Sequence, residues 1–260
     1  MEVEVEAVGS DHAGESHFDL VAVHGLYSSS TETWGSSGSV TWLTEQMTAK
    51  RFKGRVLLYS YHGNDITRGR LSTRQAVQQE ALRLLGQVAE SRKDQDPPLP
   101  LVFVAVDFGG IIVKEALIQA SMNGSEFASI RACTRILAFI GCPHRWRDID
   151  DLESKITKFI LSKDSDTFMP RQARALANTT TLVNNIFLQS QMLIRATVVN
   201  AYSTAPITTG FFDQFTATLD IPMELRYGSD KSSIDLKKDD SREPFFNTLQ
   251  RGLYRVTKCK

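Results

Sequence analysis

The 260-residue sequence has little of what several classes of protein require. Its three cysteines, Cys133, Cys142 and Cys259, lack the paired spacing of a zinc site and the even number of a disulfide framework. Thirty lysines and arginines balance thirty aspartates and glutamates, which disfavours binding to nucleic acid or to a membrane surface. No apolar run approaches the ~20 residues of a membrane-spanning helix. We therefore expect no metal, no cofactor, no nucleic-acid partner and no membrane span.

The N-terminus is acidic where a signal peptide is basic and then apolar. This pattern favours a cytoplasmic protein. Residues 1–8 also alternate glutamate with valine or alanine, a period of two that suits an edge strand with one face in water.

Short apolar runs alternate with stretches of helical periodicity along the first half of the chain. Such alternation is typical of a mainly parallel sheet with helices on both faces, because a parallel crossover usually contains a helix. The expected strands are residues 18–24, 55–61, 101–106 and 136–140, and the clearest helices are 76–88 and 111–122.

The strand pattern stops between residues 146 and 193, where apolar residues recur at helical spacing. We interpret this stretch as a helical cap inserted into one domain that comprises residues 1–260. Strand character returns at 196–202 and at 223–227, and residues 244–256 have the pattern of a final helix.

The most informative segment is residues 102–114, where a strand passes into a helix through a turn that contains Asp107, Gly109 and Gly110. This is the context of a nucleophile elbow, which holds a side chain at the carboxyl edge of a sheet. The segment resembles the elbow of the lipase-like serine esterases that are abundant in fungi, which have the α/β-hydrolase fold. That elbow reads roughly Gly-His-Ser-Leu-Gly-Gly before a Leu/Ile-Val-Lys helix.

Three further segments carry the same resemblance. Residues 21–26 resemble the strand and oxyanion loop of these esterases, residues 140–145 their Gly-Thr-Pro-His-Arg segment, and residues 57–61 their tyrosine-containing strand. The matches cover roughly residues 18–146, and they imply an α/β-hydrolase fold.

The departures from the esterase pattern concern its catalytic triad. Asp107 stands where the nucleophilic serine would be, Ser203 where the acid would be, and Lys231, by a weaker match, where the histidine would be. All five histidines precede residue 145, whereas the base of this fold follows the last strand. The resemblance therefore implies a degenerate triad, and hydrolysis by the ordinary Ser-His-acid route is not expected.

Asp107 has three interpretations. As a nucleophile it would form an ester, as in epoxide hydrolases and haloalkane dehalogenases, but no histidine is evident to activate the water that releases it. As a general acid or base it would have a pKa set by opposed effects, since burial disfavours the anion while the helix N-terminus and Lys231 favour it. In a dead site Asp107 and Lys231 would form a structural ion pair.

Other residues are candidates for supporting roles. The backbone N–H groups of Leu26 and Phe108 are a candidate oxyanion pair. His24, in the same loop, is either a hydrogen-bonding residue of the site or holds the loop in place by a hydrogen bond. Cys142 is more readily explained as a buried thiol than as a nucleophile. The following residues fall at or just past strand ends and are candidates to contact substrate: Tyr61, His62, His144 and Ser203.

Two further function classes stand beside the hydrolase that uses Asp107. The first is a non-hydrolytic enzyme that performs proton transfer, elimination, isomerisation or cyclisation on an apolar small molecule, a lyase, isomerase or cyclase of fungal natural-product biosynthesis. The apolar residues of the cap motivate this interpretation. The second is a pseudo-hydrolase that binds a ligand or protein without turnover.

Overall fold

The structure is a computed structural model that describes residues 4–8, 17–35, 41–122, 126–163, 170–190, 192–204, 212–222, 224–229 and 239–257. Its strands are β1 (Glu4–Val8), β2 (Asp19–Val23), β3 (Gly54–Tyr59), β4 (Leu101–Val106), β5 (Thr134–Ile140), β6 (Thr197–Ser203) and β7 (Leu225–Ser229). Its helices are α1 (Ser30–Trp34), α2 (Trp42–Ala49), α3 (Gly63–Arg68), α4 (Thr73–Ser91), α5 (Gly109–Met122), α6 (Ala128–Cys133), α7 (Ile149–Lys163), α8 (Pro170–Gln189), α9 (Met192–Arg195) and α10 (Asp239–Thr257).

In the described part of the chain, the seven strands form one sheet in the order β1-β3-β2-β4-β5-β6-β7. β1 is antiparallel to β3 at one edge, and every other neighbouring pair is parallel. The expected mainly parallel sheet is therefore confirmed, and the N-terminal edge strand is present.

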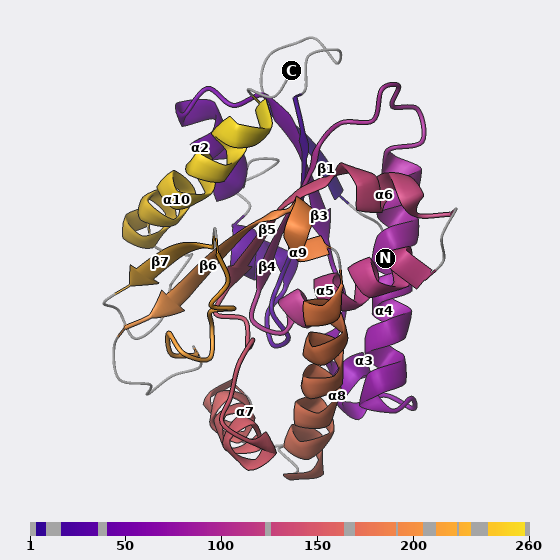
Figure 1. The fold of residues 1–260 in the computed structure, drawn as a ribbon, viewed down its shortest axis with the longest axis vertical. Coiled ribbons are helices and arrows are strands. Elements are labelled where there is room, and N and C mark those ends of the chain that lie inside the picture. The colour runs from indigo at the N-terminus through magenta and orange to yellow at the C-terminus, as the bar shows by residue number, and fades with distance from the viewer. Residues whose placement is uncertain are drawn as a thin grey trace.

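The apolar strands are buried because helices cover both faces of the sheet (Figure 1). Alternate side chains of β4 enter different cores: Phe103 and Ala105 pack with α4, α5 and α8, while Val102 and Val104 pack with α2 and α10. This is the two-residue period of a strand.

The segment expected to form a cap contains α7 and α8, which pack against each other. α8 also contacts α5 and α4, and so adds to the helical layer on one face of the sheet (Figure 1). Three short helices, α1, α3 and α6, have no counterpart in the sequence analysis, because five or six residues are too few to show a helical period.

A fully buried carboxylate, Asp19, ties the amino edge of the sheet together. Arg55 of β3 donates to both of its oxygens, from Nε at 2.8 Å and from Nη2 at 3.0 Å. Arg92, at the end of α4, also donates to Asp19, and Gln95 Nε2 donates at 2.8 Å. A buried carboxylate needs such partners, so this edge is held by paired charge.

Candidate active site

Asp107 lies on the turn between β4 and α5, at the carboxyl edge of the sheet. Its φ is 40°, a left-handed conformation that residues other than glycine seldom adopt. The turn also requires glycine at position 109, since a Cβ there would lie 2.3 Å from the backbone oxygen of His24. The tight turn therefore places the Asp107 carboxyl against the loop that follows β2.

Both candidate oxyanion donors bind Asp107 itself. The Leu26 backbone N–H donates to Asp107 Oδ1 at 2.8 Å, and the Phe108 backbone N–H donates to the same oxygen. The other carboxyl oxygen, Oδ2, lies so close to Gly25 that a Cβ there would be 2.0 Å away. In this arrangement the side chain of Asp107 fills the position that an oxyanion would take.

Burial raises the pKa of the Asp107 carboxyl from 3.8 to about 6. The N–H groups of Leu26 and Phe108 oppose this rise in pKa, as does the charge of Lys163, because all three favour the carboxylate. The residue is 8% exposed. Asp107 thus titrates close to neutral pH, where a side chain exchanges protons most effectively.

His24 locks the loop behind Asp107. Its Nδ1 lies 2.8 Å from the backbone oxygen of Gly25, and its Nε2 accepts from the Tyr61 backbone N–H at 3.1 Å. The Tyr61 ring stacks on the imidazole at a centroid distance of 4.3 Å, and its hydroxyl donates to the His24 backbone oxygen at 3.2 Å. Since both ring nitrogens are engaged, His24 in this conformation is not placed to activate a water.

An aromatic cluster of Tyr27, Phe108, Phe159 and Phe212 covers the turn. Phe108 lies 5.3 Å from Phe159 of α7 and 5.9 Å from Phe212, and Phe159 lies 6.0 Å from Tyr27, all between ring centroids. This cluster joins the loop after β2, the elbow, α7 and the segment after β6. The surroundings of Asp107 on the side of α7 are therefore aromatic, apart from the charge of Lys163 at the end of that helix.

Solved structures with this architecture cover nearly all of the chain. A Bacillus licheniformis lipase, BlEst2, matches with a TM-score of 0.63 and 14% identity over 97% of this chain and 98% of the lipase. The fold is the α/β-hydrolase fold. Mouse alpha/beta hydrolase domain-containing protein 10 has a TM-score of 0.54 and 10% identity over 98% of this chain and 94% of its own. A carboxylesterase of Nitrososphaera gargenis has a TM-score of 0.54 and 13% identity over 98% of this chain and 95% of its own. No protein-family model and no curated protein matches the sequence.

The predicted site residues of this α/β-hydrolase fold divide between two cavities and the buried interior. The predicted residues His24, Leu26, Tyr61 and His62 line one cavity of about 720 Å³ beside the loops after β2 and β3, and of these four His62 is the exposed one. Ser203 lines a different cavity, of about 580 Å³, at the end of β6. Tyr61 and His144 are buried. Lys231 lies outside the described residues, so its expected position opposite Asp107 stays a prediction.

His144 belongs to a buried network that sequence reasoning missed. Lys114 of α5 is fully buried; its Nζ lies 2.6 Å from His144 Nδ1 and donates to Asn184 Oδ1. Burial lowers the pKa of Lys114 to about 8, and burial together with the Lys114 charge holds the pKa of His144 well below its ordinary value. The available signal was a single lysine followed by Glu115 within the otherwise apolar start of a helix.

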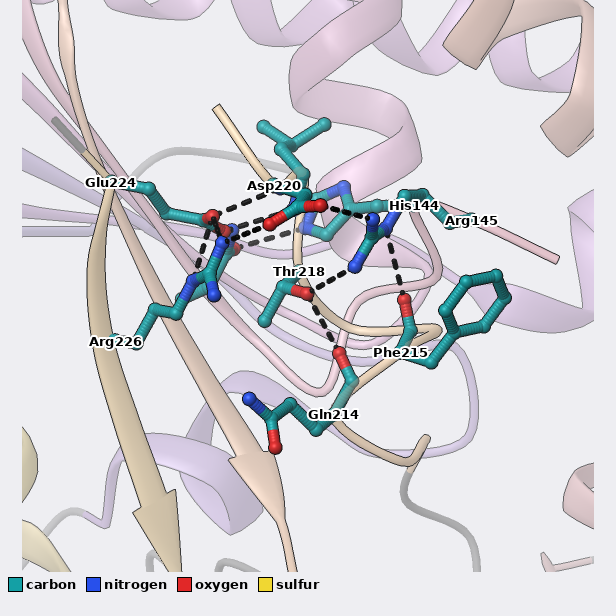
Figure 2. Close-up of polar contacts among 10 residues, drawn as sticks. His144, Arg145, Gln214, Phe215, Thr218, Asp220, Glu224 and Arg226 are labelled. Atoms are coloured by element: carbon teal, nitrogen blue, oxygen red, sulfur yellow. Dashed lines mark hydrogen bonds and ion pairs between the residues drawn. The ribbon is translucent and has the colours of Figure 1, made fainter. Parts of the chain in front are cut away.

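The network continues through Asn200 of β6 to the buried carboxylate of Glu224. His144 Nε2 lies 3.0 Å from Asn200 Oδ1, and Asn200 Nδ2 donates to Glu224. Figure 2 shows His144 beside the polar cluster that contains Glu224 and Arg226. The chain of polar groups thus connects Lys114 on α5 with the Glu224 carboxylate, which directly precedes β7.

Cys142 is a fully buried thiol. Burial raises the pKa of the Cys142 thiol to about 11, although Lys114 opposes the rise, so the thiol stays protonated at neutral pH. Among the described residues, no cluster of histidine, cysteine, aspartate and glutamate is suited to hold a metal ion.

None of the described helices is both long and apolar enough to cross a membrane.

Proposed function

We propose that the protein is a non-hydrolytic enzyme of the α/β-hydrolase fold in which Asp107 is the general acid and base. The observation that carries this proposal is a buried carboxyl at the nucleophile turn with a pKa of about 6. A positioned group of this kind accelerates proton transfer by typically ~10²–10⁴-fold. The strained backbone of Asp107 fits this role, since such conformations cluster at functional sites.

The same geometry argues against acyl transfer. Leu26 and Phe108 donate to Asp107 Oδ1, so these two donors are not available to a substrate carbonyl while the carboxyl is in place. An acyl-transfer site needs donors aimed at the oxygen that becomes negative. The arrangement instead holds one carboxyl oxygen fixed and directs the chemistry to the proton of the carboxyl group.

The proposed substrate is an apolar small molecule, because the aromatic cluster of Tyr27, Phe108, Phe159 and Phe212 borders the turn. Proton transfer, elimination, isomerisation and cyclisation all need a positioned acid or base, and we propose a reaction of this group. We assign the role of the cap to the α7–α8 segment, in which α7 covers the turn through Phe159 and α8 supports it from the helical layer. The setting of fungal natural-product biosynthesis rests on the sequence resemblance alone.

A second candidate function is binding without turnover. It is favoured by the occupation of both donors by Asp107, which would equally close a disused acyl site. The two candidates differ in whether the carboxyl transfers a proton.

A generic carbon acid separates them. 5-Nitrobenzisoxazole opens when a base removes its ring proton, and its product is coloured. We expect elimination by the wild-type protein to exceed that by Asp107→Asn, with a difference that rises with pH around a midpoint near 6. Asp65→Asn, which alters an exposed aspartate of the neighbouring cavity, is the matched control and should behave as wild type. Equal rates for wild type and Asp107→Asn would overturn the proposed role.

A further inference from the structure

The cavity of about 580 Å³ beside the end of β6 contains two arginines from different parts of the chain. Arg145 follows β5, and Arg226 belongs to β7. Figure 2 shows their guanidinium groups on either side of the Asp220 carboxylate. Asp220 Oδ2 accepts from Arg145 Nη1 at 3.0 Å, and its Oδ1 accepts from Arg226 Nη2 at 2.8 Å.

Contacts other than Asp220 hold Arg145 in place. Its Nε donates to the backbone oxygen of Phe215 at 3.2 Å, and its Nη2 donates to Thr218 Oγ1 at 2.9 Å. The guanidinium also lies 4.8 Å from the centroid of the Phe215 ring. Arg145 therefore directs Nη1 toward the cavity through contacts that do not involve Asp220.

Arg226 is held independently as well. Its Nε and Nη2 donate to Glu224 Oε2 at 2.9 Å and 2.7 Å. Glu224 is itself buried and accepts from the backbone N–H groups of Leu219 and Asp220, each at 2.9 Å. The Glu224 carboxylate therefore balances the charge of Arg226 within the fold.

The Asp220 side chain, by contrast, is open to solvent. It is 60% exposed, and the backbone of this residue has a φ of 59°. The cavity also contains Asp213, whose carboxylate lies 3.7 Å from Lys155 and so has a different cationic partner. If the Asp220 side chain turned into solvent, Glu224 would still pair with Arg226, and Arg145 would lose the one carboxylate partner it has among the described residues.

We propose that Arg145 and Arg226 form a binding site for a carboxylate or phosphate group, and that Asp220 occupies this site until such a group displaces it. Two guanidinium groups with a gap sized for one carboxylate match the planar, charge-assisted hydrogen bonding that arginine offers to both anions. The adjoining cavity accommodates the rest of a small molecule. Neither arginine contacts Asp107 or lines the cavity beside the loops after β2 and β3, so this proposal is independent of the proposed acid/base role.

The test removes the internal competitor. Calorimetric titrations would use phenyl phosphate and benzoate, with benzyl alcohol as the neutral probe. An internal carboxylate competes at a high effective concentration, so Asp220→Asn should raise the affinity for at least one of the two anions by about tenfold or more. Whichever anion binds more tightly identifies the source of the group, and benzyl alcohol should not bind more tightly to the variant.

Two comparisons exclude a general effect of charge. Asp213→Asn removes the same charge from the same cavity without freeing the arginines, and it should change the affinity far less. Adding Arg145→Gln to Asp220→Asn should abolish the gain in affinity. If thermal melting shows that this double variant does not fold, Arg145→Lys takes the place of Arg145→Gln, because lysine keeps the charge but lacks the two-pronged guanidinium. Equal gains in Asp220→Asn and Asp213→Asn, no gain in Asp220→Asn, or a gain that survives the change at Arg145 would each overturn the proposal. Asp107→Asn should leave anion binding unchanged.

Discussion

Lys114 and His144 form a buried contact of 2.6 Å between Nζ and Nδ1. Since the pKa of His144 lies well below its ordinary value, the imidazole is neutral at physiological pH. Lys114 therefore donates and His144 accepts, which leaves the proton of His144 on Nε2 for donation to Asn200. The charge of Lys114 is thus stabilised by neutral groups: an imidazole, the Asn184 amide and, at 5.2 Å, the Phe139 ring.

The first prediction concerns the pH dependence of this contact. The pKa of Lys114 falls from 10.5 to about 8 on burial, so the folded protein binds its proton less tightly than the unfolded chain does. The cost of the buried charge is complete below pH about 8 and fades as the pH rises toward 10.5. The free energy of unfolding of wild type relative to Lys114→Met should rise over this window, by up to about 3 kcal/mol.

Urea unfolding at several pH values measures this difference. Lys158→Met, at an exposed position, controls for the general effect of alkaline pH and should show no such trend. A constant difference between wild type and Lys114→Met would contradict a lowered pKa for Lys114.

The second prediction concerns the stability contributed by Asp107. The pKa of this carboxyl rises from 3.8 to about 6 in the folded protein, so folding favours the protonated form. The buried charge costs about 3 kcal/mol above pH ~6, and this cost is lost progressively as the pH falls from ~6 to ~4. Wild type should therefore gain stability relative to Asp107→Asn as the pH decreases between these limits.

Denaturant titrations near pH 8 and pH 4.5 check this sign. Asp94→Asn, at an exposed site, is the control. If wild type instead loses stability relative to Asp107→Asn at the lower pH, the carboxyl is held as a charged group and the acid/base assignment loses its basis.

The third prediction tests the close approach of Gly25 and Asp107. A Cβ at position 25 would meet Oδ2 at 2.0 Å, and its three nearest atoms all belong to Asp107. Gly25→Ala should cost about 1–3 kcal/mol, the range for overpacking a filled site. In an Asp107→Gly background the same change should cost much less.

A double-mutant cycle by thermal or urea unfolding gives the coupling energy. Independent costs of the two changes would mean that Asp107 turns away from Gly25 in solution.

The fourth prediction is the absence of simple esterase activity. Position 107 offers no serine, and no histidine follows residue 144. The wild-type protein should hydrolyse a short-chain nitrophenyl ester no faster than Asp107→Asn does, because Leu26 and Phe108 are engaged by the carboxyl. Hydrolysis that disappears in Asp107→Asn would instead favour an aspartyl-ester intermediate.

Sequence reasoning found the elements with strong patterns and the turn that joins two of them. The β4 run is apolar throughout, and the glycines after Asp107 mark a tight turn, so both were readable. The direction of the Asp107 carboxyl could not be predicted from the sequence, because it depends on the loop 81 residues earlier that supplies the Leu26 N–H. Arg145 and Arg226 were missed for the same reason, since their spacing along the chain gives no hint that Asp220 lies between them.

The buried Asp19 cluster makes the amino ends of the strands differ from their carboxyl ends in how firmly they are held. Arg55, Arg92 and Gln95 converge on one carboxylate, so β2, β3 and the chain after α4 are clamped where the strands begin. The opposite ends of the strands carry the Asp107 turn. Loops at those ends therefore have room to change shape or sequence while the strand register stays fixed from the amino ends.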